Sequence, residues 1–207
     1  MMLVRIYLRS IRLPLPDRIW RVVQPDRLAR AGRFLREEDR LRCLAAGLLL
    51  SDILDVHSDS DTELNIYGKP LLKLGLPFFS LSHSGEYAAL AVADVPVGVD
   101  IELIQPFDIS SAKSCFTENE YGWLAKQHND EAFYRLWTAK EAVLKADGTG
   151  FAADPARFDV LEAKSGQQCI INGEPVLFYR NEIQGHALCA AARTGGRAAE
   201  FELSIQS

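Results

Sequence analysis

Residues 85–102 read GEYAALAVADVPVGVDIE, and this stretch decides the fold class. Small and β-branched residues fill 87–93, which predicts a buried strand. After a short turn, apolar and polar residues alternate over 97–102, so we expect a second strand that returns beside the first. A later stretch, 185–192, reads GHALCAAA and resembles the GEYAALAVA of the opening stretch, which indicates two related halves.

Helical spacing dominates the sequence on both sides of this stretch. Apolar residues over 26–55 recur every three or four positions, which predicts two helices broken near residues 36–39. A capping box at 117–120 predicts the start of another helix, and 131–146 has the pattern of a helix that ends before Gly148. Strands and helices in this order favour the α+β class.

The chain is expected to form two related α+β lobes. We place the N-terminal lobe at residues 1–105 and the C-terminal lobe at 106–207. Strands are also expected at 3–8 and 78–81, with a turn at 82–85 after the second of these.

The composition is that of a globular protein with a sizeable core. The 207 residues are 48% hydrophobic, enough for one domain or two small lobes that share an interface. The four cysteines form no Cys-x-x-Cys pair, so we expect free thiols in a reducing cytoplasm rather than a zinc site or disulfides. Neither a secretory signal nor a membrane span is expected, because the longest apolar run, at 44–50, is too short to cross a bilayer.

Charge is distributed unevenly along the chain. Residues 1–50 hold 11 arginines, no lysine and 5 acids, whereas the whole chain has a net charge of -5. The planar guanidinium of arginine can make paired hydrogen bonds to an oxyanion, which favours a phosphate-bearing ligand. A solvated helix face accounts for the same arginines equally well on charge alone.

Two carboxylates share one face of the strand expected at 97–102. Asp100 and Glu102 would lie about 6.5 Å apart at a rise of ~3.3 Å per residue, close enough to converge on one hard cation. The alternative is a strand end whose polar face is exposed to solvent and binds no ion.

The helix expected at 131–146 carries Trp137, Glu141 and Lys145 as one stripe, spaced four residues apart. An exposed Glu–Lys pair worth ~0.2–0.5 kcal/mol is the ordinary interpretation. Trp137 instead favours a half-buried stripe at an interface or cleft. His83, in a polar stretch, is a base, a ligand donor or a loop histidine.

In combination, five motifs resemble those of a known enzyme family. They are YGKP at 67–70, LSHSGEYAALAVA at 81–93, GVDIE at 98–102, FTENEY at 116–121 and LWTAKEAVLKADGTG at 136–150. They closely resemble the successive motifs of the 4'-phosphopantetheinyl transferases of the surfactin-activating (Sfp) type. The resemblance runs from about residue 26 to residue 158.

The resemblance implies a fold and an activity. The fold would be a monomer of two lobes related by a pseudo-twofold axis. Each lobe would be a small antiparallel sheet packed with helices, with the active site in the cleft between them. The enzyme would be cytoplasmic and would use Mg2+, with Mn2+ as an alternative. It would transfer the 4'-phosphopantetheine arm of coenzyme A to a serine of an apo acyl or peptidyl carrier protein and release adenosine 3',5'-bisphosphate.

The resemblance also implies residue roles. Asp100, Glu102 and Glu141 would bind the metal, and Lys145 would contact the pyrophosphate of coenzyme A. Glu120 is the first candidate for the general base and Glu141 the second. The 3'-phosphate would be bound by Arg27, Arg30 and His83, and the nucleotide would be surrounded by Lys69, Pro70, Cys43 and Ser82.

Two rival functions would use some of the same residues. A magnesium-dependent nucleotide pyrophosphate hydrolase would use the same acids, whereas an arginine-rich nucleic-acid-binding module would account for the arginines but not the acids.

A hypothetical docking surface for the carrier consists of Phe107, Ile109 and Phe116, with core packing of a loop as the equal alternative. Carriers of fatty-acid, polyketide and nonribosomal-peptide synthases and the carrier domain of a dehydrogenase or reductase all fit, and no nucleic acid or membrane is expected as a partner.

Overall fold

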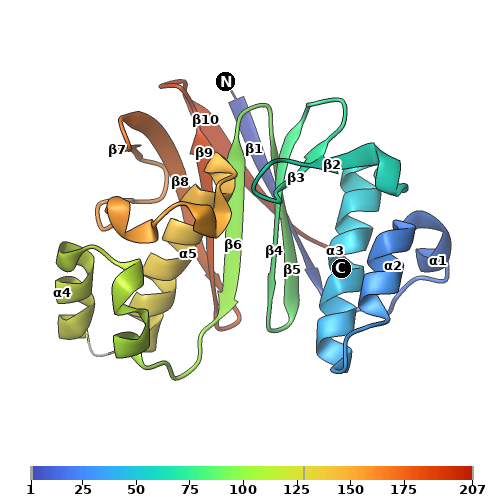
Figure 1. Ribbon diagram of the computed structural model, residues 1–207, viewed down its shortest axis with the longest axis horizontal. Coiled ribbons are helices and arrows are strands. Elements are labelled where there is room, and N and C mark those ends of the chain that lie inside the picture. The colour runs from blue at the N-terminus through green and yellow to red at the C-terminus, as the bar shows by residue number, and fades with distance from the viewer. Residues whose placement is uncertain (1, 128, 207) are drawn as a thin grey trace.

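Two four-stranded sheets form the centre of the molecule, and Figure 1 shows them between two groups of helices. The computed structural model describes residues 2–127 and 129–206. The strand order is β10-β1-β5-β4 in the first sheet and β6-β9-β8-β7 in the second. The strands are β1 (Met2–Ser10), β4 (Phe78–Ser84), β5 (Tyr87–Ala93), β6 (Val97–Leu103), β7 (Gln168–Ile171), β8 (Glu174–Ile183), β9 (His186–Arg193) and β10 (Ala199–Gln206).

The two sheets are covered by different helices. The helix α3 packs on β5 and β1, and α5 packs on β6 and β9. The helices are α1 (Ile19–Val22), α2 (Pro25–Ala31), α3 (Glu37–Leu54), α4 (Glu118–Gln127) and α5 (Asp130–Asp147). The smaller elements are the strand pair β2 (Thr62–Leu64) and β3 (Pro70–Leu72) and the 3-10 turns Asp59–Asp61, Ile109–Cys115, Gly150–Ala152 and Pro155–Arg157.

The α+β class and the main helices agree with the sequence. The two predicted helices are α2 and α3, but the break between them lies at residues 32–36, and residues 37–39, expected in the break, begin α3. The Asn129 side chain accepts a hydrogen bond from the Ala132 N–H at the start of α5, and Gly148 ends the helix with a φ of 70°. No helix in the described part of the chain has the length and apolar character that crossing a membrane requires.

The partner expected for residues 97–102 is wrong. β6 pairs with β9 of the second sheet, whereas β5 pairs with β1 and β4. The connection at 94–96 therefore carries the chain from one sheet to the other, and Pro96 has no N–H with which to continue a hairpin ladder. A local pattern indicates a strand but does not identify a partner far along the chain.

Two strands cross the predicted lobe boundary at residue 105. β6 precedes this boundary but belongs to the second sheet, and β10 follows it but belongs to the first. β10 runs parallel to β1, so the first sheet is not the purely antiparallel sheet that we expected. Both sheets contribute to one shared apolar core, which includes Val97, Val99 and Ile101. The division into residues 1–105 and 106–207 stays a prediction.

The turn expected at 82–85 is wrong as well, because β4 continues to Ser84. Every second residue in this part of β4 is a serine, and its hydroxyl accepts a hydrogen bond from a backbone N–H of β6. The pairs are Ser80 with Val99 at 3.1 Å, Ser82 with Ile101 at 3.4 Å and Ser84 with Leu103 at 3.1 Å. These bonds join an edge of the first sheet to an edge of the second and satisfy donors that have no strand partner there.

Gly98 determines how closely β6 approaches α5. A Cβ atom at this position would overlap the carbonyl oxygen of Ala142 and the backbone nitrogen of Ala146. Helix backbone cannot move aside as the end of a side chain can, so only glycine fits here. This close approach brings the part of α5 that holds Glu141 and Lys145 next to β6.

Replacing Gly98 with alanine should therefore destabilise the protein by about 1–3 kcal/mol or more, the usual cost of an overpacked core. Gly122→Ala on α4 is the matched control, because a Cβ atom there would meet nothing within 4 Å. Chemical denaturation of both variants gives the two changes in the free energy of unfolding. Equal values would contradict the close approach of β6 and α5.

Candidate active site

A cavity of about 450 Å3 opens between α5 and the elements of the first half of the chain. Its walls come from α2, α3, β3, β4, β6 and α5. The lining residues are Arg27, Arg30, Ala46, Pro70, Leu81, Ser82, His83, Asp100, Glu102, Trp137, Glu141 and Lys145. Most of the residues that the sequence singles out for chemistry therefore line one cavity of ligand-binding size.

Asp100 is the most enclosed acid of the cavity, with an exposed fraction of 2%. Its Oδ1 accepts hydrogen bonds from the Ser82 hydroxyl at 2.7 Å and from the Lys145 ammonium at 2.6 Å. Its Oδ2 is buried and has no partner in the described part of the chain. A buried carboxylate oxygen without a partner is costly, so this atom favours a ligand that brings a positive charge.

Glu102 and Glu141 add two further carboxylates. Glu102 Oε2 accepts a hydrogen bond from the Ser84 hydroxyl at 2.7 Å, and Glu141 Oε1 is buried without a partner. Burial and, next, the charge of Asp100 raise the pKa of Glu102 to about 6 and the pKa of Glu141 to about 7. Negative charge is therefore poorly compensated at this end of the cavity, as in many functional sites.

The three carboxylates fit a hard divalent cation in kind but are not preassembled. Carboxylate oxygens are the protein ligands that Mg2+ prefers, and Asp100 and Glu141 each have a buried oxygen without a partner. Within residues 2–127 and 129–206, no three His, Cys, Asp or Glu side chains form a complete metal-binding group. Lys145 bonds Asp100 and Ser84 bonds Glu102, so a cation would have to draw these carboxylates together.

The raised pKa values predict how the stability of the metal-free protein depends on pH. The folded protein holds protons on Glu102 and Glu141 above the unfolded pKa of ~4.3, so it binds more protons than the unfolded chain up to about pH 7. The contribution of these two groups to stability should therefore fall as pH rises through this window. Denaturation in a chelating buffer should show Glu141→Gln gaining stability relative to the wild type as pH rises. A difference that does not change with pH would contradict the raised pKa.

Two arginines and a histidine also line the cavity. Arg27 and Arg30 come from α2, and His83 comes from β4. The Nε of Arg27 is buried and has no partner, and burial lowers the pKa of this guanidinium. A phosphate would supply an acceptor oxygen for this N–H group.

Two residues expected at the nucleotide have other contacts. The Lys69 ammonium donates to the backbone carbonyl of Lys145 at 2.6 Å and to that of Val97 at 3.2 Å. Cys43 is buried, and its thiol donates to the carbonyl of Arg27 at 3.7 Å. Their positions do not support a direct contact between either side chain and a nucleotide in the main cavity.

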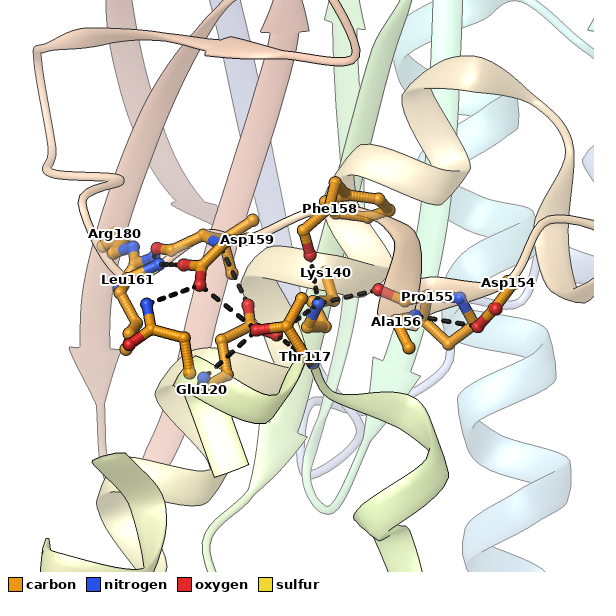
Figure 2. Close-up of polar contacts among 12 residues, drawn as sticks. Thr117, Glu120, Lys140, Asp154, Pro155, Ala156, Phe158, Asp159, Leu161 and Arg180 are labelled. Atoms are coloured by element: carbon orange, nitrogen blue, oxygen red, sulfur yellow. Dashed lines mark hydrogen bonds and ion pairs between the residues drawn. The ribbon is translucent and has the colours of Figure 1, made fainter. Parts of the chain in front are cut away.

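Glu120 is fully buried outside the cavity, in the polar network of Figure 2. Its Oε2 lies 2.7 Å from the Lys140 ammonium and accepts a hydrogen bond from the Thr117 N–H, while its Oε1 accepts one from the Val160 N–H. Lys140 also donates to two backbone carbonyls within residues 155–158. Both oxygens of Glu120 are occupied and neither is exposed, which argues against the predicted role as general base.

The residues considered for carrier docking contact the apolar cluster around α5. Phe116 is 4% exposed, and Phe107 stacks on Phe133 with the ring centroids 4.1 Å apart. Ile109 packs against the same cluster. Phe116 is therefore a core residue, whereas Phe107 and Ile109 are only partly buried, and carrier docking at these two residues stays a prediction.

Sequence reading missed the roles of three residues: Ser80 and Ser84, which bond β6 beside the site, and Lys140, which pairs with Glu120 outside the cavity. The alternation of serines at 80, 82 and 84 was a usable signal, because alternate residues of a strand share one face. No local signal pointed to Lys140, since its partner Glu120 comes from another helix.

Comparisons with known proteins agree with these motifs. Residues 96–195, which include β6 and α5, match the 4'-phosphopantetheinyl transferase superfamily. The chain is 35% identical over 163 residues to 4'-phosphopantetheinyl transferase gsp of Aneurinibacillus migulanus, which covers 73% of this chain and 68% of that protein. It is 31% identical over 164 residues to 4'-phosphopantetheinyl transferase Sfp of Bacillus subtilis (strain 168), covering 74% and 73%. A further 4'-phosphopantetheinyl transferase of Bacillus subtilis is 31% identical over 191 residues, covering 84% and 85%.

Proposed function

The chain belongs to the 4'-phosphopantetheinyl transferase superfamily, and we propose that the 450 Å3 cavity is where it binds coenzyme A and transfers the phosphopantetheine arm. The protein is a transferase of the Sfp type that acts on carrier proteins. We assign the site on one observation: three carboxylates, a lysine and two arginines line the same cavity. One chain supplies all of these groups, which supports a monomer with its active site in a cleft between two lobes.

Asp100, Glu102 and Glu141 would hold the metal ion, Mg2+ in this proposal. When bound, such an ion neutralises charge on the pyrophosphate oxygens of coenzyme A. The partnerless oxygens of Asp100 and Glu141 support this assignment. Substrate oxygens and water would complete the coordination, as is usual for Mg2+.

Lys145 would contact the pyrophosphate. Its ammonium is bonded to Asp100 and faces the same cavity, so the charge is already held near the reacting group. The ammonium, once no longer bonded to Asp100, would stabilise the oxygens that gain charge during transfer.

Arg27, Arg30 and His83 would bind the 3'-phosphate of coenzyme A. They stand on elements other than those of the carboxylates, so the anionic ligand would span the cavity from α2 to α5. The buried Nε of Arg27, which has no partner among residues 2–127 and 129–206, supports this role.

Transfer requires the carrier serine to lose its proton. We propose that Glu141 accepts this proton as the general base. Its carboxylate lies in the cavity and has an oxygen without a partner among the described residues, whereas Glu120 lies outside the cavity. The serine oxygen forms a bond to the β-phosphorus, and the bond from that phosphorus to the bridging oxygen breaks. Adenosine 3',5'-bisphosphate leaves with the electron pair of the broken bond.

Chromatography of the nucleotide products tests this proposal against a pyrophosphate hydrolase. With Mg2+ and coenzyme A, the protein should release adenosine 3',5'-bisphosphate only when an apo carrier with an intact serine is present. Release at the same rate without a carrier would favour the hydrolase. Binding to nucleic acid with a steep dependence on salt, and no nucleotide product, would favour a nucleic-acid-binding module.

A further inference from the structure

The tip of the β2–β3 hairpin is hydrogen-bonded to the C-terminal end of α5. The Asn65 amide nitrogen donates to the carbonyl of Gly148 at 2.8 Å, and the Lys69 ammonium donates to the carbonyl of Lys145 at 2.6 Å. We propose that Asn65 and Lys69 are positioning residues that clamp α5 against the hairpin and so fix Lys145 for transfer. The proposal rests on the function given above, which makes Lys145 a contact of the substrate.

Asn65 has two separate tasks in this arrangement. Its Oδ1 accepts hydrogen bonds from the backbone N–H groups of Tyr67 and Lys69, both at 2.9 Å, and these bonds shape the turn. Its Nδ2 is left to face α5 and bonds Gly148. Turn formation and the bond to α5 therefore use different atoms of one side chain, and a substitution can separate them.

Lys69 acts on carbonyl groups that the helix itself cannot satisfy. The last carbonyls of an α-helix have no intrahelical donor, and a cation near them is favoured by the helix dipole. The Lys69 ammonium meets the Lys145 carbonyl and also the Val97 carbonyl at 3.2 Å, so it links α5 and β6 to the hairpin. Burial lowers the pKa of Lys69 to about 8, in keeping with a lysine that faces carbonyls rather than solvent.

Gly148 makes room for both contacts. It has a φ of 70°, and a Cβ atom there would lie 3.0 Å from the Asn65 Nδ2 and 3.2 Å from the Lys69 Cδ. The glycine thus ends α5 and lets the two side chains approach its last carbonyls.

The residues of the clamp lie beside two cavities. Pro70, next to Lys69, lines the main cavity together with Lys145. A second cavity of about 230 Å3 lies between the hairpin tip and α5 and is lined by Gly68, Lys69, Lys145 and Gly148 among others. Loosening the clamp would change the distance between Pro70 and Lys145, so the effect should fall on coenzyme A and on kcat rather than on the carrier.

Three variants distinguish a clamp from a direct contact between Lys69 and the nucleotide. Asn65→Asp keeps the acceptor that shapes the turn but loses the donor to Gly148, and it leaves Lys69 in place. Lys69→Met removes both bonds of the ammonium. Lys73→Met is the control, because Lys73 follows the same hairpin but is exposed.

We expect Asn65→Asp and Lys69→Met to lower kcat/KM for coenzyme A by about tenfold or more while KM for the carrier stays within about twofold of the wild type. Lys73→Met should match the wild type. Hydrogen exchange should rise in both variants at two places, the hairpin tip and the end of α5. Normal kinetics for Asn65→Asp with a defect only in Lys69→Met would overturn the clamp and favour direct contact of Lys69 with the nucleotide.

The exchange measurement keeps this test separate from the proposed function. Unchanged exchange at the end of α5 in both variants would overturn the clamp whatever the activity. A wild-type protein that transfers nothing would count against the proposed function, and also against a positioning role for the clamp. Raised exchange with wild-type kinetics would reduce Asn65 and Lys69 to a structural role.

Discussion

Replacing Glu141 with glutamine should abolish transfer and leave the fold intact. The substitution keeps the shape of the side chain but removes the charge that would bind the cation and accept the serine proton. Loss of a single charge-stabilising group at a reacting centre commonly costs about 10²–10³ in kcat, and here one residue is proposed for two tasks, so the loss should reach at least the upper end. The measurement is kcat/KM for an apo carrier at saturating Mg2+ and coenzyme A.

Stability distinguishes a functional loss from unfolding in this variant. Burial and the charge of Asp100 raise the pKa of Glu141 to about 7, so its negative charge is unfavourable in the metal-free fold. The glutamine variant should therefore be at least as stable as the wild type above that pH. Glu131→Gln, at an exposed position on the same helix, is the matched control. Full activity in Glu141→Gln would refute its role at the metal and as the base.

Glu120→Gln and Lys140→Met should each destabilise the protein by about 3–5 kcal/mol, because each leaves a buried group without its partner charge. Both side chains are 0% exposed, and their closest atoms are 2.7 Å apart. The double variant should recover part of the loss, since it removes both charges together. Denaturant unfolding of the four proteins gives the coupling energy of the pair.

Activity measured on folded Glu120→Gln decides between structure and catalysis. If the pair only supports the fold, the variant should keep kcat within about tenfold of the wild type at a temperature where it is folded. It should also keep the same pH profile. Wild-type stability combined with a large loss of kcat would restore Glu120 as the general base.

The helices and the acids of the site were predictable because they follow from local patterns. The spacing of apolar residues located α3 and α5, and the alternation over 97–102 gave a strand with Asp100 and Glu102 on one face. The stripe of Glu141 and Lys145 follows from helical geometry alone. These features depend on residues that are close in sequence.

The remaining features depend on contacts between distant parts of the chain. Asp100 pairs in the sheet with Cys189, and Glu120 meets Lys140 only because α4 and residues 154–161 fold onto α5. The family resemblance of the YGKP motif implies a nucleotide contact for Lys69, yet its ammonium bonds the end of a helix that follows much later in the chain. Sequence periodicity carries no information about such partners.

The most direct test of the central claim is the intact mass of an apo carrier protein after incubation with this protein, Mg2+ and coenzyme A. We predict that the carrier gains the mass of one phosphopantetheine arm on its serine. The gain should be absent when the carrier serine is replaced by alanine and when the enzyme carries Glu141→Gln. An unchanged mass across fatty-acid, polyketide and nonribosomal-peptide carriers, with the wild-type protein shown to be folded, would contradict the account.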